Sequence, residues 1–207
     1  MRFVFILLGV LLSALPTQAR PVSYPGGWTF ITTNDKDANA TLIHYSPSAK
    51  YSIGWRHEYL RGPKAHADMI QMNNLVKRWN APNSQANFYI KSGAGIAYED
   101  GKTDPAAFTG FAIDWENRRY FTSYENKFFW ADDVTKYAKH KARIGVTPYI
   151  GDYGDIHTWL MLQADYDAGA KDTFSLTPMV RFFKGSSLLE AGYNLDNAVM
   201  FNFIQRF

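Results

Sequence analysis

Apolar and polar residues alternate along most of the chain beyond residue 25. In segment 50–60, for example, Ile53 and Trp55 alternate with Gly54 and Arg56. The same period of two recurs through the chain, and the sequence after the N-terminal segment contains no convincing amphipathic helix. A period of two is typical of β-strands that have one apolar and one polar face. The sequence therefore predicts an all-β protein.

Clusters of Gly, Pro, Asn and Asp separate the alternating segments and favour turns. The pattern predicts twelve strands, near residues 25–34, 40–46, 50–60, 68–79, 86–98, 107–115, 119–130, 140–150, 157–167, 173–183, 187–194 and 198–207. Pro148 and Pro178 fall inside two of these strands, and proline cannot donate to a strand ladder. We interpret both as bulges or strand ends. If they divide the pattern differently, the number of strands falls to ten or eight.

The first 19 residues have the pattern of a secretory signal peptide. Arg2 is followed by an apolar run from Phe3 to Leu12, and the small-residue site Thr17-Gln18-Ala19 comes next. This order of a positive charge, a short apolar core and a small-residue site is typical of a cleaved export signal. We expect cleavage after Ala19, which leaves residues 20–207 as a single domain without a linker or repeat.

Composition narrows the class of protein further. The chain has 207 residues, of which 46% are hydrophobic and 16% are aromatic, and this excludes a disordered chain. The net charge of +3 is spread along the sequence and does not indicate a nucleic-acid partner. The chain has no cysteine, so disulfides, thiolate metal sites and cysteine nucleophiles are excluded.

An exported all-β chain could be a soluble sandwich or a membrane barrel, and three features favour the barrel. The polar faces carry many isolated charges and glycines, as a wet interior would. Aromatic residues gather at the ends of the apolar faces, as in the two girdles of a membrane barrel. The last predicted strand carries Val199, Phe201, Phe203 and Phe207 on one face.

A signal peptide, an even number of alternating strands, no cysteine and a terminal phenylalanine together resemble a Gram-negative outer-membrane β-barrel protein. The resemblance implies a closed antiparallel up-and-down transmembrane barrel in the outer membrane, surrounded by lipid. It also implies that Phe201, Phe203 and Phe207 form the signal that the barrel-assembly machinery reads. Gln205 departs from that pattern, because an aromatic or apolar residue is commoner there.

Charged residues on the polar faces are expected to line the lumen of this barrel. They are Arg56, Glu58, Lys91, Glu99, Asp114, Glu116, Lys141, Arg143, Asp165, Arg181 and Glu190. Such a lumen would pass ions or small polar solutes, so a narrow pore or transport-related barrel is the main hypothesis. A plugged barrel that acts structurally or binds an envelope partner is the alternative. Lys139, Lys141 and Arg143 form the only basic cluster and suggest anion preference.

Two further motifs suggest chemistry without establishing it. His44 and Ser46 have the His-x-Ser spacing seen in some lipid A deacylases, which makes an outer-membrane lipid hydrolase a second alternative. His66, Met69 and Met72 carry ligand types that suit copper. No close pair of histidines has a regular spacing, however. We therefore predict no catalytic residue, no metal ion and no cofactor.

Overall fold

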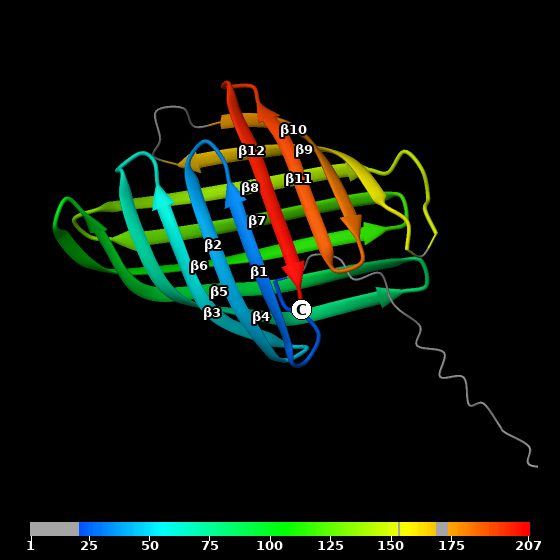
Figure 1. Cartoon of the computed structure of the whole chain (residues 1–207), viewed down its shortest axis with the longest axis horizontal. Helices are drawn as coiled ribbons and strands as arrows, with labels where there is room; N and C mark the ends of the chain where they lie inside the picture. Colours follow the sequence, from blue (N-terminus) through cyan, green and yellow to red (C-terminus); the bar gives the residue numbers. More distant parts are fainter. Residues whose placement is uncertain (1–20, 153, 169–173) are drawn as a thin grey trace, which may run out of the picture.

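The computed structural model describes residues 21–152, 154–168 and 174–207, and within these it forms one closed β-barrel (Figure 1). The twelve strands are β1 (Gly27–Asn34), β2 (Ala38–Ser48), β3 (Tyr51–Leu60), β4 (Ala65–Ala81), β5 (Ser84–Glu99), β6 (Lys102–Asn117), β7 (Tyr120–Ala131), β8 (Thr135–Val146), β9 (His157–Ala168), β10 (Phe174–Lys184), β11 (Ser187–Asn194) and β12 (Ala198–Arg206). Each strand pairs antiparallel with its sequence neighbours, and β1 pairs with β12. The predicted up-and-down barrel of twelve strands is confirmed, whereas the predicted signal peptide lies outside the described residues.

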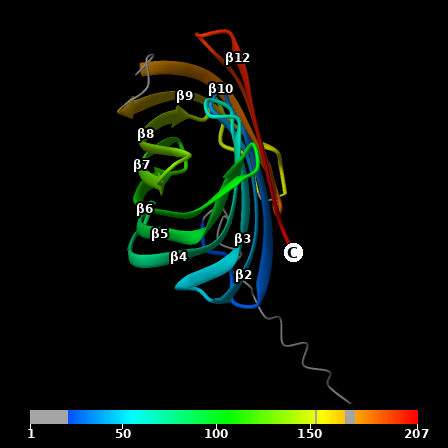
Figure 2. The ribbon, with the colours of Figure 1, turned by 90° about the vertical axis from the view of Figure 1, so that its left-hand side faces the viewer.

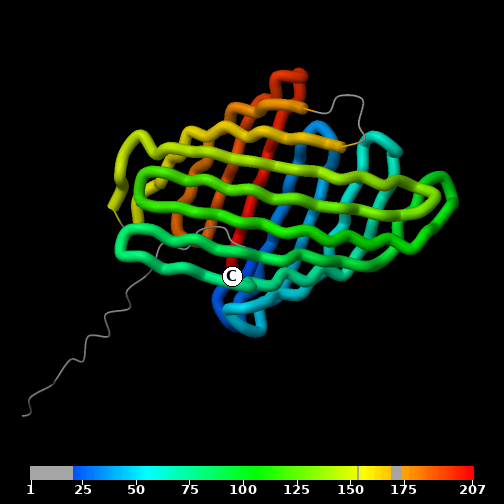
Figure 3. Tube along the Cα trace, turned by 180° about the vertical axis from the view of Figure 1, so that it is seen from behind, coloured from blue at the N-terminus to red at the C-terminus, as the bar shows by residue number. Residues whose placement is uncertain are grey.

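The barrel is flattened into two walls whose strands cross steeply. Figures 1 and 3 show β5 to β8 running across the direction of β1, β2 and β12, and Figure 2 shows the two walls facing each other. Strands β4, β5 and β6 have 17, 16 and 16 residues, whereas β1 and β11 have 8 each. About 9–11 residues suffice for a strand to span a membrane, so the long strands extend past a bilayer core. No helix among the described residues is long and apolar enough to cross a membrane.

Alternate residues of each strand point outward and inward. On β3, Ile53 and Trp55 lie on the outer face and are 45% and 43% exposed, whereas Ser52 and Glu58 are buried on the inner face. Closure of the barrel leaves no strand edge unpaired, which is the requirement for β-structure within lipid. The result is an outer surface rich in exposed apolar side chains and an inner surface of mixed character.

Two apolar clusters fill parts of the interior. The first lies on the inner faces of β3 to β7 and contains Leu60, Ala67, Met69, Ala97, Ala106, Phe108, Phe129 and Ala131. The second joins inner faces of β7, β9, β10 and β12 and contains Phe121, Trp159, Met161, Met179 and Met200. Phe121 faces inward because it packs into this second apolar cluster. The remaining interior is lined by polar and charged groups.

Both prolines occupy places where the ladder does not need their missing N–H. Strand β8 spans Thr135–Val146, so it begins and ends earlier than the predicted strand 140–150. Pro148 therefore lies beyond its end. Pro178 lies inside β10 opposite Leu162 of β9, and pairing with β11 begins only at the next residue, Met179. The number of strands is therefore not reduced.

Candidate functional site

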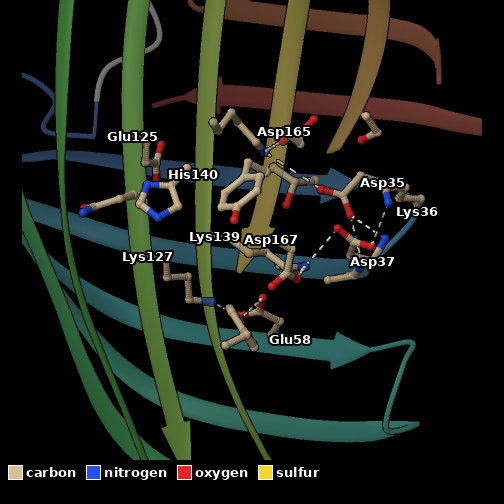
Figure 4. A pocket seen from close by; sticks show the side chains of 18 of the residues that line it. Asp35, Lys36, Asp37, Glu58, Glu125, Lys127, Lys139, His140, Asp165 and Asp167 are labelled. Carbon is tan, nitrogen blue, oxygen red and sulfur yellow. Dashed lines mark hydrogen bonds and ion pairs between the residues drawn. The ribbon is translucent and has the colours of Figure 1, made fainter. Parts of the chain in front are cut away.

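A cavity of about 120 Å³ lies inside the barrel, next to the turn between β1 and β2 (Figure 4). It is lined from β1, β2, β3, β7, β8, β9 and β10 as well as from that turn, and most of its lining side chains are charged. A volume of this size can hold several water molecules. We call this end of the barrel, which also carries the β3–β4, β5–β6, β7–β8 and β11–β12 turns, the mouth.

The β1–β2 turn reaches across the mouth to strand β8. Asp37 Oδ2 lies 3.0 Å from Lys139 Nζ, and Asp35 Oδ2 lies 4.0 Å from Lys141 Nζ. Strand β8 is not a neighbour of β1 or β2 in the barrel, so both ion pairs span the lumen. Figure 4 shows the Asp37 carboxylate and the Lys139 ammonium pointing toward each other. The turn thus lies across the mouth, where ion pairs join it to the opposite wall of the barrel.

The turn is held in this position by its own hydrogen bonds. Asp35 Oδ1 accepts hydrogen bonds from the backbone N–H groups of Asp37 and Ala38, both at 2.9 Å. Arg61 of the β3–β4 turn donates to the Asp35 carbonyl at 3.1 Å. Burial raises the pKa of the Asp35 carboxyl, but Lys141 and the Ala38 N–H lower it more, so this pKa lies below its usual value. Asp35 therefore stays ionised opposite Lys141.

The two lysines of β8 are shared between carboxylates on either side. Lys139 also lies 3.8 Å from Asp167, and Lys141 lies 3.9 Å from Asp165, both on β9. The basic cluster inferred from the sequence is therefore neutralised at close range, and it gives no reason to expect anion preference. Of the two contacts that the turn makes with β8, the Asp35–Lys141 pair at 4.0 Å is looser than a direct charge-assisted hydrogen bond, whereas Asp37–Lys139 at 3.0 Å is a close pair.

Below the mouth, Glu58 forms the centre of a second cross-lumen contact. Arg56 Nε donates to Glu58 Oε2 at 2.9 Å, and Lys127 Nζ of β7 donates to the same oxygen at 2.6 Å. Strands β3 and β7 are not neighbours, so this contact also crosses the interior. The Lys127 ammonium lies 5.0 Å from the centre of the Phe108 ring, a cation–π distance. The carboxylate is fully paired and the first apolar cluster packs beside it.

A third group of charges surrounds Glu190 on β11. Arg181 donates to Glu190 Oε1 from Nε at 2.7 Å, and its Nη2 lies 2.6 Å from the same oxygen. Asn202 Nδ2 donates to Oε2 at 2.7 Å, and Arg143 Nη1 lies 3.4 Å from Oε1. All four side chains point into the lumen. Together with the Lys91–Glu125 pair at 2.7 Å, they continue the charged lining between the apolar clusters.

The other residues predicted to line the lumen fall on inward positions of β5 and β6. Asp114 accepts a hydrogen bond from Asn87 at 2.6 Å, Glu116 is buried, and Glu99 is half-buried near the mouth. The cross-lumen contacts described above are made by other residues. Five luminal charged residues were not among those predicted from the sequence: Asp35, Asp37, Glu125, Lys127 and Asp167. Alternation along β7 and β9 does place Glu125, Lys127 and Asp167 on inward positions, so this signal could have found them.

The aromatic residues of the last strand lie on the outer face. Phe201 and Phe203 alternate with the inward Met200 and Asn202. Phe207 follows β12 and is 68% exposed, and its backbone exchanges two hydrogen bonds with Trp28 at 3.2 and 2.9 Å. Their role as an assembly signal remains a prediction.

The His-x-Ser pair faces the interior at the opposite end. His44 and Ser46 are both fully buried, and Ser46 Oγ accepts a hydrogen bond from the Ser23 N–H at 3.0 Å. This contact belongs to the segment before β1, which enters the lumen and buries Val22 against Tyr89 and Ala112. A buried inward pair has no access to lipid, so the geometry gives no support to a lipid hydrolase at this position.

The two methionines whose thioethers suit copper do not meet either. Met69 is buried on the inner face of β4, whereas Met72 is exposed on its outer face, because residues three apart on a strand point to opposite sides. Among the described residues, no group of three or more His, Cys, Asp or Glu side chains is arranged to hold a metal ion.

No family model and no curated protein matches this chain in sequence. Solved structures do match its fold. The KdgM porin, solved alone and in complex with disordered oligogalacturonate, aligns with a TM-score of 0.50 at 8% identity, over 87% of this chain and 98% of the porin. OccAB4 of Acinetobacter baumannii aligns with a TM-score of 0.41 at 7% identity, over 86% of this chain and 57% of that chain. The match to the KdgM porin shows that the chain has the fold of an outer-membrane β-barrel.

Proposed function

We propose that the protein is a narrow outer-membrane pore for ions or small polar solutes, which the β1–β2 turn closes at the mouth. The observation that carries this proposal is the pair of cross-lumen contacts, Asp37 with Lys139 and Asp35 with Lys141. A charged, hydrated mouth suits polar solutes, and the two apolar clusters take up part of the interior, which favours a narrow pore over a wide one. The KdgM porin, which shares this fold, was solved with an oligogalacturonate.

Single-channel recording in planar bilayers tests the pore and its closure together. We expect the wild-type protein to show a small conductance with long closed periods. The double variant Asp35→Asn with Asp37→Asn removes both contacts to β8, so it should spend several times longer open. The control is Asp132→Asn, which removes a surface pair with Lys136 at the same end without touching the lumen. An Asp132→Asn variant that opens as readily as the double variant would contradict closure by the turn.

The filled interior favours a plugged barrel as the second candidate function. Val22 enters the lumen from the end opposite the mouth, and two apolar clusters occupy much of the interior. A plugged barrel would act structurally or by holding an envelope partner. Absence of conductance in the folded wild type and in the double variant alike would favour this candidate over the pore.

We further propose that residues 1–19 are removed on export and that the final strand directs assembly into the outer membrane of a Gram-negative bacterium. Phe207→Ala removes an exposed terminal ring, and it should lower the yield of folded barrel in the outer-membrane fraction severalfold. Leu195→Ala is a matched control, because Leu195 is 65% exposed and Phe207 68% exposed, and only the second lies beside the closing strand pair. Equal folded yields of the two variants, measured by heat-modifiable migration on gels, would argue against the proposal.

A further inference from the structure

A polar cluster lies on the outer face of the barrel, at the mouth end of β3, β4 and β5. His57 of β3 is in register with Asp68 of β4, and His66 of β4 is in register with Tyr59 and Tyr98 on either side. The outward positions just below it, Ile70 and Ile96, are apolar and exposed. His66 is the second residue of β4 and Tyr98 the second-last of β5, so the cluster lies at the rim of the barrel, where water can reach it.

Asp68 organises this cluster by accepting hydrogen bonds from three aromatic side chains. Trp55 Nε1 donates to Asp68 Oδ1 at 3.0 Å, and the Tyr98 hydroxyl donates to Oδ2 at 3.1 Å. His57 Nδ1 lies 3.0 Å from Oδ1. An ionised carboxylate can only accept, so the His57 proton sits on Nδ1. The other ring nitrogen, Nε2, is left with its lone pair.

That lone pair faces a second imidazole. His57 Nε2 lies 3.4 Å from His66 Nδ1, which is longer than the usual 2.7–3.2 Å range of an N–H hydrogen bond. Two imidazole nitrogens bound at about 2.0–2.1 Å to one tetrahedral ion lie about 3.3 Å apart. The observed separation is that of a long hydrogen bond between the two imidazoles, and it is also close to the spacing of two nitrogen ligands on one metal ion.

The rings are held in place by stacking on their neighbours. His66 stacks on Tyr98 with ring centres 5.3 Å apart and planes 13° apart, and His57 stacks on Trp55 with centres 5.9 Å apart. The Asp68 contact fixes the orientation of His57, as carboxylates do for the ligating histidines of many metal sites. Small ring rotations would suffice to bring both lone pairs onto one ion.

We propose that His57 and His66 form an outward-facing site for a divalent transition-metal ion of the kind that imidazole prefers, such as Cu²⁺, Zn²⁺ or Ni²⁺. His57 binds through Nε2 and His66 through Nδ1, and Asp68 orients His57 without touching the ion. The protein supplies two ligands and water supplies the others. The site lies outside the lumen, so it stands whether or not the barrel conducts.

Copper titration of the untagged, detergent-folded barrel tests this site, because Cu²⁺ is the tightest binder among these ions. Electron paramagnetic resonance should show one Cu²⁺ with two imidazole nitrogens in the wild type. His57→Gln and His66→Gln should each leave one such nitrogen and weaken binding at least tenfold. Asp68→Asn should keep both nitrogens and weaken binding about ten- to a hundredfold, as for other partners of ligating histidines.

His140→Gln is the matched control, because His140 is also an outward histidine and lies 2.6 Å from the Tyr124 hydroxyl. It should bind Cu²⁺ as the wild type does. Heat-modifiable migration on gels checks that each variant is folded. The proposal is overturned if the folded wild type binds no Cu²⁺, or if His57→Gln and His66→Gln bind it as tightly and with the same spectrum as His140→Gln.

Discussion

Glu190→Ala should destabilise the barrel by about 3–5 kcal/mol, the cost of leaving a buried charge without its partner. Arg181 and Asn202 both donate to the Glu190 carboxylate at 2.7 Å, and Arg181 is itself buried. Without the carboxylate, the Arg181 guanidinium remains in the lumen beside the Phe121 ring, 4.6 Å from its centre. Urea unfolding in lipid vesicles, followed by tryptophan fluorescence, measures the change.

The control for this prediction is an ion pair at the rim. Asp132 and Lys136 pair at 2.6 Å, but both side chains are more than half exposed. Exposed pairs contribute about 0–1 kcal/mol, so Asp132→Ala should change the free energy of unfolding by no more than that. If Glu190→Ala costs as little as Asp132→Ala, then water around Glu190 solvates Arg181. In that case the description of Arg181 and Glu190 as a buried ion pair is wrong.

Most of the fold could be predicted because the two faces of each strand meet different surroundings. Apolar outward positions and polar inward ones give a clear period of two, as on β3 between Ile53 and Arg56. Short turns then force consecutive strands to pair, so the topology follows from the number of strands. The exceptions lie at the rims. Lys136 occupies an outward position near the start of β8, where the alternation breaks down, so the predicted strand starts too late.

The candidate site could be predicted only in part, because its contacts join elements far apart in sequence. Alternation points Lys141 into the lumen, but no local pattern reveals that the turn containing Asp35 leans against it. Strand β7 also departs from regular alternation, since the buried Asn126 side chain accepts a hydrogen bond from the Phe111 N–H. His57 and His66 are nine residues apart and meet only through the register of a hairpin.

Leu162→Arg should destabilise the barrel in a lipid bilayer by about 2–4 kcal/mol, the cost of an arginine on the lipid face near the midplane. Leu162 lies mid-strand on β9, faces outward with 39% of its surface exposed, and is in register with Ile144 and Pro178. No acidic side chain is its direct register partner, so the new guanidinium would have no adjacent carboxylate. Urea unfolding in vesicles again measures the effect.

Leu195→Arg places the same charge in the β11–β12 turn, where Leu195 is 65% exposed. Near the membrane interface an arginine costs about 0–1 kcal/mol. The two variants carry the same new charge and differ in its depth in the membrane. The comparison also separates a membrane barrel from a soluble one with the same strands. In water, an arginine at position 162 would simply be solvated. A Leu162→Arg variant as stable in vesicles as Leu195→Arg would therefore mean that the apolar outer face of β9 does not contact lipid.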